Sequence, residues 1–499
     1  MAITGILANR ELDDYEKDDA FNFKEKGDAI KGFLEYNIET LSHNKMVVLY
    51  GGWGTGKTSL MKHISNTIDT NIYRPIFFHA WEHEKDNNLP LSLVDCLVAN
   101  LETGLTENLK EFMKAAYLTF KSFASGVSLK ASTPLTGLGL GMEVEISGDK
   151  IVTSLDKAFE KDIPSFFIQN EEFKRKFKLI ETELLAKSNA TKLLVLVDDL
   201  DRCEPENVLN LLTALKLFFT YSENTVFFCG IDKDAVVKAV RTKYQDVVKS
   251  EEYLEKVFDI SFNMPKTYSL NKLLRVYFSK ESERDLFVLE DFFNRIAFTN
   301  PRHLKKVLNK YEIIKSFATN STISDNIRQL IPNVLTDGNG DVFETIYCLF
   351  FIVLYEFFPE KFTEIEHYNK KIEGYGHIYL STLKRNNPDS RVELEAITMD
   401  LINKKIPNIK HASITSILND VKSFAKDGFV RFLFIFTEAN PDTFAPFLDD
   451  EMDRYPIYFN KSEVLSLFCK FLIDNKDNIM ETKSDYKVWN LFNMAKYLL

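Results

Sequence analysis

The chain of 499 residues carries a net charge of −11, and 45% of its residues are apolar. This length is more than one ordinary hydrophobic core accommodates and indicates roughly two to four domains. The acidic balance excludes a generally basic nucleic-acid-binding coat, although it leaves room for a local basic groove. Five cysteines lie far apart and form no C-x-x-C pair, which argues against a zinc site or a disulfide framework and favours a reducing cytoplasm.

Neither of the two candidate segments for membrane insertion or secretion has the required pattern. The amino-terminal stretch MAITGILANRELDDYEKDD has no long apolar core and becomes acidic early, so we expect no signal peptide there. The longest apolar run, residues 346–358, stops before Pro359 and is shorter than the roughly 20 residues that span a bilayer. We therefore expect a buried helix at this run and no integral membrane span, while peripheral membrane contact stays open.

The first half of the chain alternates apolar runs with helical patterns, after a polar lead and a helix expected at about residues 28–41. Such alternation is typical of a mostly parallel sheet covered by helices on both faces. After residue 265 the pattern is helical almost throughout. The sequence thus predicts an α/β core followed by an all-α carboxyl-terminal region. The five expected strands are residues 46–50, 75–81, 193–197, 225–230 and 257–262.

The strongest motif follows the first expected strand, MVVLY, and reads GGWGTGKTSL from residue 51. Its spacing fits G-x-x-x-x-G-K-[ST], the phosphate loop of P-loop NTPases, in which glycines let backbone N–H groups turn toward phosphate oxygens. Lys57 is placed for the β- and γ-phosphates, and the Thr58 hydroxyl for Mg²⁺. Apolar residues then recur at helical spacing, so a helix N-terminus is expected to face the phosphates. The residues assigned to nucleotide binding are Gly51, Gly52, Trp53, Gly54, Thr55, Gly56, Lys57, Thr58 and Ser59.

A second motif, KLLVLVDDLDRCEPENV from residue 192, supplies what a phosphate loop lacks. Hydrolysis also needs a carboxylate for the metal and a group that orients the attacking water. Asp198 is expected at the carboxyl end of a buried strand, the edge at which open α/β sheets bind ligands, and it is assigned to Mg²⁺ together with Thr58. Asp199 is assigned to polarise the attacking water, and Lys57 joins it among the catalytic residues.

Three further charged residues near these motifs have two interpretations each. Asp201 either orients Arg202 or helps to hold the metal shell. Arg202 either reaches γ-phosphate charge, in its own or a neighbouring subunit, or forms a local ion pair with Asp201. Asp232, two residues after the expected strand TVFFCG, either senses the γ-phosphate or caps the helix that follows. The sequence leaves these alternatives open.

The expected domain boundaries divide the chain into three parts. Residues 1–265 form the P-loop NTPase core, with an insertion at about residues 85–190 between the two nucleotide motifs. Residues 266–335 form a helical, lid-like domain, and residues 336–499 a carboxyl-terminal helical domain. Within the insertion, residues 122–150 are rich in Gly, Ser and Thr and predict a flexible loop or small hairpin, either exposed to solvent or in contact with a membrane or partner.

Six segments carry a more specific signal in combination than the phosphate loop alone; in chain order they are GGWGTGKTSL, FFHAWEHE, VLVDDLDRCEP, FFCGID, EYLEKVFDISFNMP and TNPRHLKKVLN. Together they resemble the KAP family of P-loop NTPases over about residues 10–315. The resemblance implies an ATPase of the additional-strand class, similar to AAA+ and signal-transducing NTPases, with a helical region behind the core. It also implies that Arg302 is the helical-domain arginine that closes onto bound nucleotide. Many family members carry transmembrane helices between the two nucleotide motifs, where this chain has its Gly/Ser-rich insertion.

Two other patterns are weaker. His79 and His83 are four residues apart, but a strand is expected to end between them and no third ligand is near, so we expect no metal site there. Trp81, between the two histidines, is expected to pack under the phosphate loop. The stretch FKRKFK from residue 173 predicts a solvated helix face with both phenylalanines turned inward, and nucleic-acid contact is the alternative.

The sequence therefore predicts an intracellular, Mg²⁺-dependent ATPase that acts as a conformational switch. ATP and Mg²⁺ are the expected cofactors. A protein partner or self-association into an oligomer is expected, and a nucleic-acid partner is left undecided. The resemblance implies phage defence or signalling in a bacterial cytoplasm. The alternatives are a nucleic-acid-stimulated ATPase motor and a nucleotide-binding scaffold at the membrane.

Overall fold

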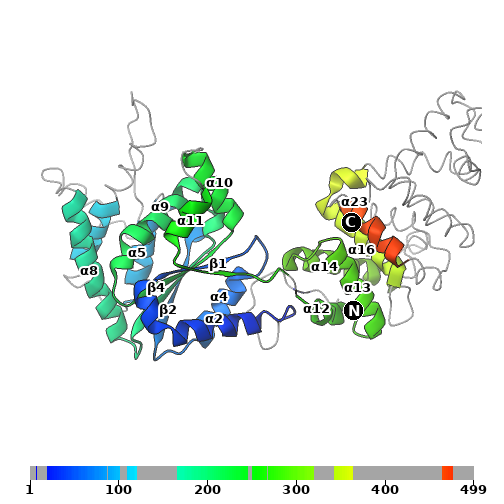
Figure 1. The fold of residues 1–499 in the computed structure, drawn as a ribbon, viewed down its shortest axis with the longest axis horizontal. Coiled ribbons are helices and arrows are strands. Elements are labelled where there is room, and N and C mark those ends of the chain that lie inside the picture. The colour runs from blue at the N-terminus through cyan, green and yellow to red at the C-terminus, as the bar shows by residue number, and fades with distance from the viewer. Residues whose placement is uncertain are drawn as a thin grey trace, which may run out of the picture. The chain divides into compact units, whose positions relative to one another are not determined.

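A computed structural model of the protein describes residues 7, 19–86, 88–101, 109–120, 166–244, 250–266, 268–319, 342–363 and 464–475. The chain divides into two compact units, one of Arg10–Tyr268 and one of Met1–Asn9 with Ser269–Leu499. The first unit contains a β-sheet, and the second is helical in its described segments (Figure 1).

The sheet of the first unit is built from β1 (Met46–Tyr50), β2 (Tyr73–His79), β3 (Lys192–Asp198), β4 (Thr225–Ile231) and β5 (Ile260–Asn263). Its five strands are all parallel and lie in the order β2-β3-β4-β1-β5. β4 thus lies between β1, which leads into the glycine-rich loop, and β3, which ends at the paired aspartates. This is the additional strand that the family resemblance implied, and the predicted α/β core with a five-stranded, mostly parallel sheet is confirmed.

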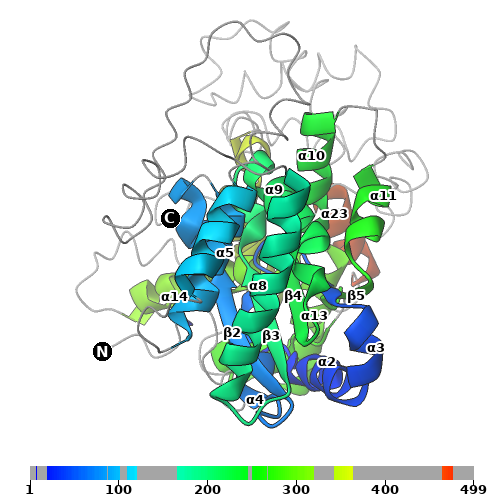
Figure 2. The ribbon, with the colours of Figure 1, turned by 90° about the vertical axis from the view of Figure 1, so that its left-hand side faces the viewer.

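Helices cover both faces of this sheet (Figure 1). One face carries α2 (Lys24–Tyr36), α3 (Ile38–His43) and α4 (Lys57–Thr67). The other face carries α5 (Leu89–Ala99), α8 (Phe166–Ala186), α9 (Pro205–Leu217), α10 (Lys233–Tyr244) and α11 (Ser250–Val257). Figure 2 looks onto α5, α8 and α9, behind which β2, β3 and β4 run side by side.

Burial on both faces follows from the alternation of side chains along each strand, because successive side chains point to opposite faces. Met46 and Val48 of β1 belong to the core that also contains residues of α5, α8 and α9. Val47 and Leu49 are equally buried and face the side of α2 and α4. A strand buried on both faces is a continuous apolar run in the sequence, which makes MVVLY recognisable.

Two of the strand predictions are shifted. The strand expected at residues 75–81 spans Tyr73–His79, and the chain then turns into the 3-10 helix η1 (Ala80–Asp86). The strand expected at residues 257–262 is wrong at its start, because Val257 is the last residue of α11. Its apolar side chain packs in the core from a helix, so hydrophobicity alone does not distinguish the two states.

The single helix predicted over residues 28–41 is also wrong, since α2 and α3 separate at Asn37. The backbone N–H and the side-chain amide of Asn37 both donate to the Phe33 carbonyl, at 3.1 and 2.9 Å. Asparagine suits such a helix end because its short side-chain amide can bond back to a carbonyl in the last turn of the helix.

The described part of the predicted insertion is helical and packs on the sheet. α5, residues 109–120 and α8 all contribute to the core on one face. The rings of Phe112 and Phe173 are 5.8 Å apart, and those of Phe173 and Phe177 are 5.9 Å apart. Phe173 and Phe177 are fully buried, so the inward-facing prediction for FKRKFK is confirmed. The predicted loop at residues 122–150 lies outside the described residues.

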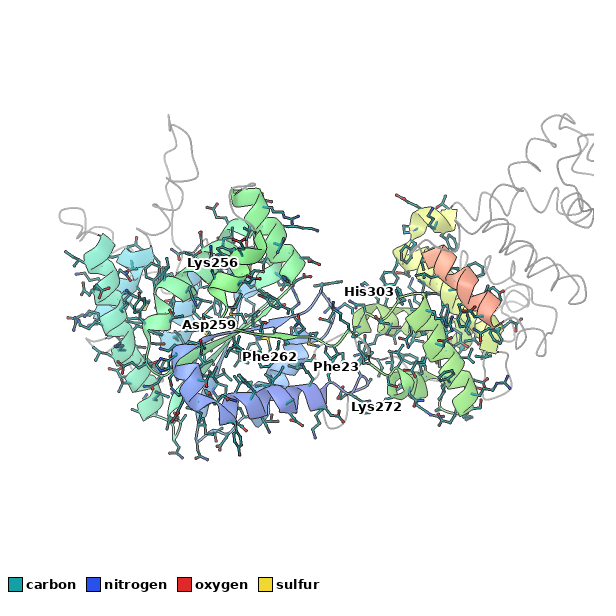
Figure 3. The ribbon with its side chains drawn as sticks, in the orientation of Figure 1. Phe23, Lys256, Asp259, Phe262, Lys272 and His303 are labelled. Atoms are coloured by element: carbon teal, nitrogen blue, oxygen red, sulfur yellow. The ribbon has the colours of Figure 1, made fainter. Side chains whose placement is uncertain are left out.

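Asp259, labelled in Figure 3, fixes β5 against the start of β1. One of its carboxylate oxygens accepts the Met46 N–H at 3.0 Å, and the other accepts Lys216 Nζ at 2.7 Å. The Asp259 N–H donates in turn to the Met46 carbonyl at 2.9 Å. These contacts hold β1 in register at the end opposite the glycine-rich loop.

The second unit contains α12 (Asn271–Tyr277), α13 (Glu283–Arg295), α14 (Pro301–Thr319), α16 (Val342–Phe357) and α23 (Val464–Asp474). His303 of α14, labelled in Figure 3, lies against Phe357 of α16 with ring centroids 4.4 Å apart. Phe292 of α13 lies against Phe468 of α23 at 5.9 Å. The described segments after residue 265 are thus largely helical, as predicted. The domain limits at residues 265 and 335 stay predictions.

α16 contains most of the longest apolar run of the sequence. Its residues from Val342 to Leu354 are buried, so the prediction of a buried helix at this run is confirmed. In the segments that the structure describes, no helix combines the length and apolar composition that crossing a bilayer requires.

Asp95 of α5 offers a test of the electrostatics of the sheet unit. Burial raises the pKa of its carboxyl to about 6 from 3.8, with a further rise from Asp86 and an opposing effect of His83. Because the folded-state pKa is the higher one, the folded state binds the proton more tightly. The stabilisation by this proton is complete below about pH 4 and is lost as the pH rises through about 6.

We therefore expect Asp95→Asn to raise the free energy of unfolding by about 2 kcal/mol at pH 8. The gain in melting temperature should be several degrees at pH 8 and markedly smaller at pH 4.5. Scanning calorimetry at both pH values measures this difference, with the exposed acid of α10, in Asp234→Asn, as the matched control. An equal shift at both pH values would contradict the pKa of about 6.

Candidate functional site

The glycine-rich loop connects the end of β1 to the start of α4. The N–H of Gly51 donates to the Ile231 carbonyl at 3.1 Å, so the loop leaves the sheet beside β4. Gly54 and Gly56 have φ angles of 80° and 96°, a left-handed backbone that glycine adopts without strain. Gly56 is the residue directly before α4. A loop of this kind at a helix N-terminus is suited to bind an anion.

Lys57 is enclosed by the loop. Its Nζ donates to the carbonyls of Gly51 and Gly52 at 2.8 and 3.3 Å, and it forms an ion pair with Asp201 at 3.3 Å. The side chains of Lys57 and Asp201 are only 8% and 6% exposed. Asp201 therefore pairs with Lys57, and not with Arg202 as one of the two interpretations had it.

Asp198, the last residue of β3, is completely buried. Neither of its carboxylate oxygens has a hydrogen-bond partner of ordinary geometry among the described residues. Burial raises the pKa of this carboxyl, while the Thr58 hydroxyl, the Asp199 N–H and the Lys57 charge lower it in part. A buried carboxylate without a partner is unfavourable, and a cation held between Asp198 and Thr58 would remove that cost. The hydroxyl and carboxylate oxygens offered here fit a hard cation such as Mg²⁺.

Asp199 has a φ of 57°, which is uncommon for a residue other than glycine. It precedes the 3-10 helix η2 (Leu200–Arg202), and its side chain pairs with Arg202 at 2.7 Å. Burial raises the pKa of Asp199, and the charge of Asp198 raises it further, against the effect of Arg202. Arg202 thus forms a local ion pair, but with Asp199 and not with Asp201.

Trp81 of η1 lies beside this ion pair. The Arg202 guanidinium lies over the Trp81 ring at 5.3 Å from its centroid. The Trp81 side chain is 51% exposed, so the prediction that it packs under the phosphate loop is wrong. The strand that was expected to carry Trp81 inward ends two residues earlier, at His79.

Asp232 follows β4, and its two carboxylate oxygens have different surroundings. Oδ1 accepts the N–H groups of Asp234 and Ala235 at 3.0 and 3.4 Å, at the start of α10. Oδ2 lies 3.9 Å from the position that a Cβ at Gly52 would take. The capping role is therefore present, and the second oxygen faces the glycine-rich loop.

His79 is a residue of this site that the sequence argument missed. β2 and β3 pair with His79 directly opposite Asp198. The potential ligand atoms of His79, Asp198 and Asp199 all lie within 4.8 Å of one another, so the expectation that no further ligand is near His79 is wrong. His83 takes no part, since it pairs with Asp86 at 3.0 Å. The three residues come together because β2 lies beside β3 in the sheet, which the sequence alone does not show.

The structure brings the loop, Lys57 and Asp198 together at the carboxyl edge of the sheet, with Asp199 beside them. Trp53 of the loop is 53% exposed. Arg302 lies in the first turn of α14 in the helical unit, and its N–H donates to the Asn300 side chain at 3.0 Å. The assignment of Arg302 to bound nucleotide stays a prediction.

Because Gly230 of β4 has no side chain, the Asp198 carboxylate can occupy the space beside it. A Cβ at this position would lie 2.5 Å from Met61 Sδ and 3.1 Å from Asp198 Oδ1. We expect Gly230→Ala to destabilise the sheet unit by about 1–3 kcal/mol, since both buried neighbours must move. The melting temperature measures this loss. Gly32→Ala on α2 is the matched control, because nothing lies within 4 Å of its added methyl, and an unchanged melting temperature for Gly230→Ala would contradict the packing described.

Comparison with known proteins extends these observations. The KAP family P-loop domain matches residues 34–318. Two uncharacterized proteins of Methanocaldococcus jannaschii are similar in sequence. MJ0181 is 44% identical over 126 residues, which is 24% of this chain and 50% of that protein, and MJ0182 is 33% identical over 172 residues, 31% of this chain and 88% of that protein.

Among solved structures, the ORC2 protein of Aeropyrum pernix in ADPNP and ADP complexes aligns over 95% of this chain and 94% of its own. The identity is 11% and the TM-score 0.25, so this similarity carries no argument. The family match, by contrast, is specific, because the matched residues include both nucleotide motifs and all five strands of the sheet. The chain belongs to the KAP family of P-loop NTPases.

Proposed function

We propose that this chain binds ATP with Mg²⁺ and hydrolyses it, and that the bound nucleotide switches the conformation of the helical unit. The observation that carries the proposal is the buried Asp198 carboxylate, which lacks a hydrogen-bond partner of ordinary geometry among the described residues and faces Thr58 beside the glycine-rich loop. The carboxylate favours a cation, and the loop at the N-terminus of α4 favours an anion. A triphosphate with its metal ion satisfies both.

The phosphates are held by the loop residues 51–59 and by Lys57. In the structure the Lys57 ammonium bonds to two loop carbonyls and to Asp201, and phosphate oxygens would offer stronger, charged acceptors to the same group. Thr58 and Asp198 are the residues that would hold Mg²⁺. When bound, this ion neutralises negative charge on the β- and γ-phosphates.

Asp199 is the group that positions the attacking water. The water oxygen bonds to the γ-phosphorus while the bond to the β,γ-bridging oxygen breaks, and ADP leaves with that oxygen. Asp199 accepts the proton of the water, and its raised pKa, caused by burial and by Asp198, favours that transfer. The ion pair with Arg202 holds the carboxylate in place.

The proposed biological setting follows from the family and from the cysteine pattern. The family resemblance supports the closure of Arg302 onto the nucleotide, an oligomer, and a role in bacterial phage defence or signalling. The wide spacing of the cysteines supports a cytoplasmic location, and Cys96, Cys203, Cys229 and Cys348 are free thiols. The core, lid-like and carboxyl-terminal domains with limits at residues 265 and 335 belong to the same proposal.

Phosphate release from ATP tests this function. We expect Mg²⁺-dependent turnover by the wild-type chain and none by Lys57→Ala, with the rate measured alone and with DNA, RNA or liposomes. A rate that rises with DNA or RNA and falls again with salt would favour the nucleic-acid motor. A rate that rises only with liposomes would favour a role at the membrane. Tight ATP binding without turnover in any of these conditions would contradict hydrolysis.

A further inference from the structure

We infer that the chain binds a divalent transition metal ion, of the kind represented by Mn²⁺, through His79, Asp198 and Asp199. The inference deepens the proposed function by naming the metal preference of the same site, and it rests on that proposal for the role of the ion. Mg²⁺ is sufficient for the proposed hydrolysis, whereas the imidazole adds affinity for ions that accept nitrogen ligands.

The three side chains come from two neighbouring strand ends. His79 is the last residue of β2, Asp198 is the last residue of β3, and the two are paired in register. Asp199 follows in a left-handed conformation. The convergence is therefore built from the sheet itself, and the ligand atoms of all three lie within 4.8 Å of one another.

These distances are close to those of a metal site. Ligand atoms at about 2.1 Å from one ion lie roughly 3.0 Å apart when adjacent and roughly 4.2 Å apart when opposite. Atoms within 4.8 Å of one another reach such an arrangement by small side-chain rotations. The backbone of the strands need not move.

The charges and partners around the three residues also favour a cation. Asp198 is fully buried, and neither oxygen has a hydrogen-bond partner of ordinary geometry among the described residues. Lys57 is engaged by two loop carbonyls and Asp201. Asp199 is paired with Arg202, which offsets one of the two carboxylates, whereas Asp198 forms no ion pair with a described residue and feels the Lys57 charge only in part.

The His79 ring packs against a neighbouring aromatic ring. It stacks on Phe77 with centroids 4.7 Å apart and an interplanar angle of 28°, and the side chain is partly buried. The His79 nitrogen beside the two carboxylates gives a ligand set with both nitrogen and oxygen donors. Mg²⁺ gains little from an imidazole, whereas Mn²⁺ and the later divalent metals of the first row accept it readily.

Electron paramagnetic resonance of the full chain titrated with Mn²⁺, without nucleotide, tests this site. We expect one Mn²⁺ per chain with a ¹⁴N coupling in the spin-echo modulation. His79→Leu should remove that coupling and weaken Mn²⁺ binding at least about tenfold. Mg²⁺ affinity, measured by competition with Mn²⁺, should change less than about twofold. The control is His43→Leu, which removes an exposed histidine at the end of α3 and should change neither value.

Unchanged Mn²⁺ affinity and coupling in His79→Leu would overturn the inference, as would the absence of Mn²⁺ binding by the wild type. Circular dichroism checks that the variant is folded, and His79→Gln, which keeps a polar side chain, is the second variant if it is not. Binding of ATP with Mg²⁺ is measured separately on the wild type and Lys57→Ala. Failure of that binding would count against the proposed function, whereas the Mn²⁺ result depends only on His79 and its partners.

Discussion

Replacing Lys57 by alanine should weaken ATP binding at least about 100-fold and abolish phosphate release. The ammonium lies inside the glycine-rich loop, on two of its carbonyls, where it would meet the β- and γ-phosphates. Two hydrogen bonds to charged oxygens contribute about 3 kcal/mol or more, which corresponds to that loss of affinity. Titration calorimetry with a non-hydrolysable ATP analogue measures the dissociation constant.

The control for this variant must separate binding from folding, because alanine at position 57 leaves the buried Asp201 carboxylate without its partner. The double variant Lys57→Ala/Asp201→Asn removes that unpaired charge, so it should fold and still fail to bind. Lys238→Ala removes a lysine exposed on α10 and should bind like the wild type. Wild-type affinity in either Lys57 variant would show that the loop is not the phosphate site.

Asp199→Asn should lower the rate of hydrolysis about 10²- to 10⁴-fold while the affinity for ATP changes by only a small factor. The amide cannot accept a proton from water, and such acid–base roles contribute rate effects of that size. Asp198 and Thr58, the residues proposed to hold the metal, are unchanged in this variant. Single-turnover phosphate release measures the chemical step, and calorimetry measures the affinity.

Asp199 also pairs with Arg202, so the loss of the ion pair must be measured by itself. Arg202→Gln breaks the same pair and keeps the carboxylate, and we expect a smaller loss of rate than for Asp199→Asn. Glu172→Gln on the exposed side of α8 serves as the control for the removal of a surface charge. Hydrolysis at the wild-type rate by Asp199→Asn would assign the water-positioning role to another residue.

Most strands of the sheet can be predicted from the sequence because the central strands are buried on both faces. β1 has the limits that the apolar run predicts, β3 is longer by one residue at each end, and β4 is longer by one residue at its carboxyl end. β5 is less buried, with a pattern of alternating exposure, and Val257, the expected first residue of this strand, lies in a helix. Helix limits such as the break at Asn37 depend on single hydrogen bonds that an apolar pattern does not reveal.

The site can be predicted from the sequence only in part, because some of its contacts depend on the three-dimensional fold. The spacing of the loop residues and the acidic end of β3 are local features, and the family match supports the fold that they imply. The partners of Asp201 and Arg202 depend on how η2 turns after Asp199, which local sequence does not determine. His79 joins the aspartates only because β2 lies beside β3, and no local spacing connects residues so far apart in the chain.

The most direct measurement is a crystal structure of the chain with a non-hydrolysable ATP analogue and Mg²⁺. We expect the β- and γ-phosphates within hydrogen-bond distance of Lys57 Nζ and the loop N–H groups, with the metal ion beside Thr58 and Asp198. Density for the analogue elsewhere, with the loop closed on its own lysine, would contradict the proposed site.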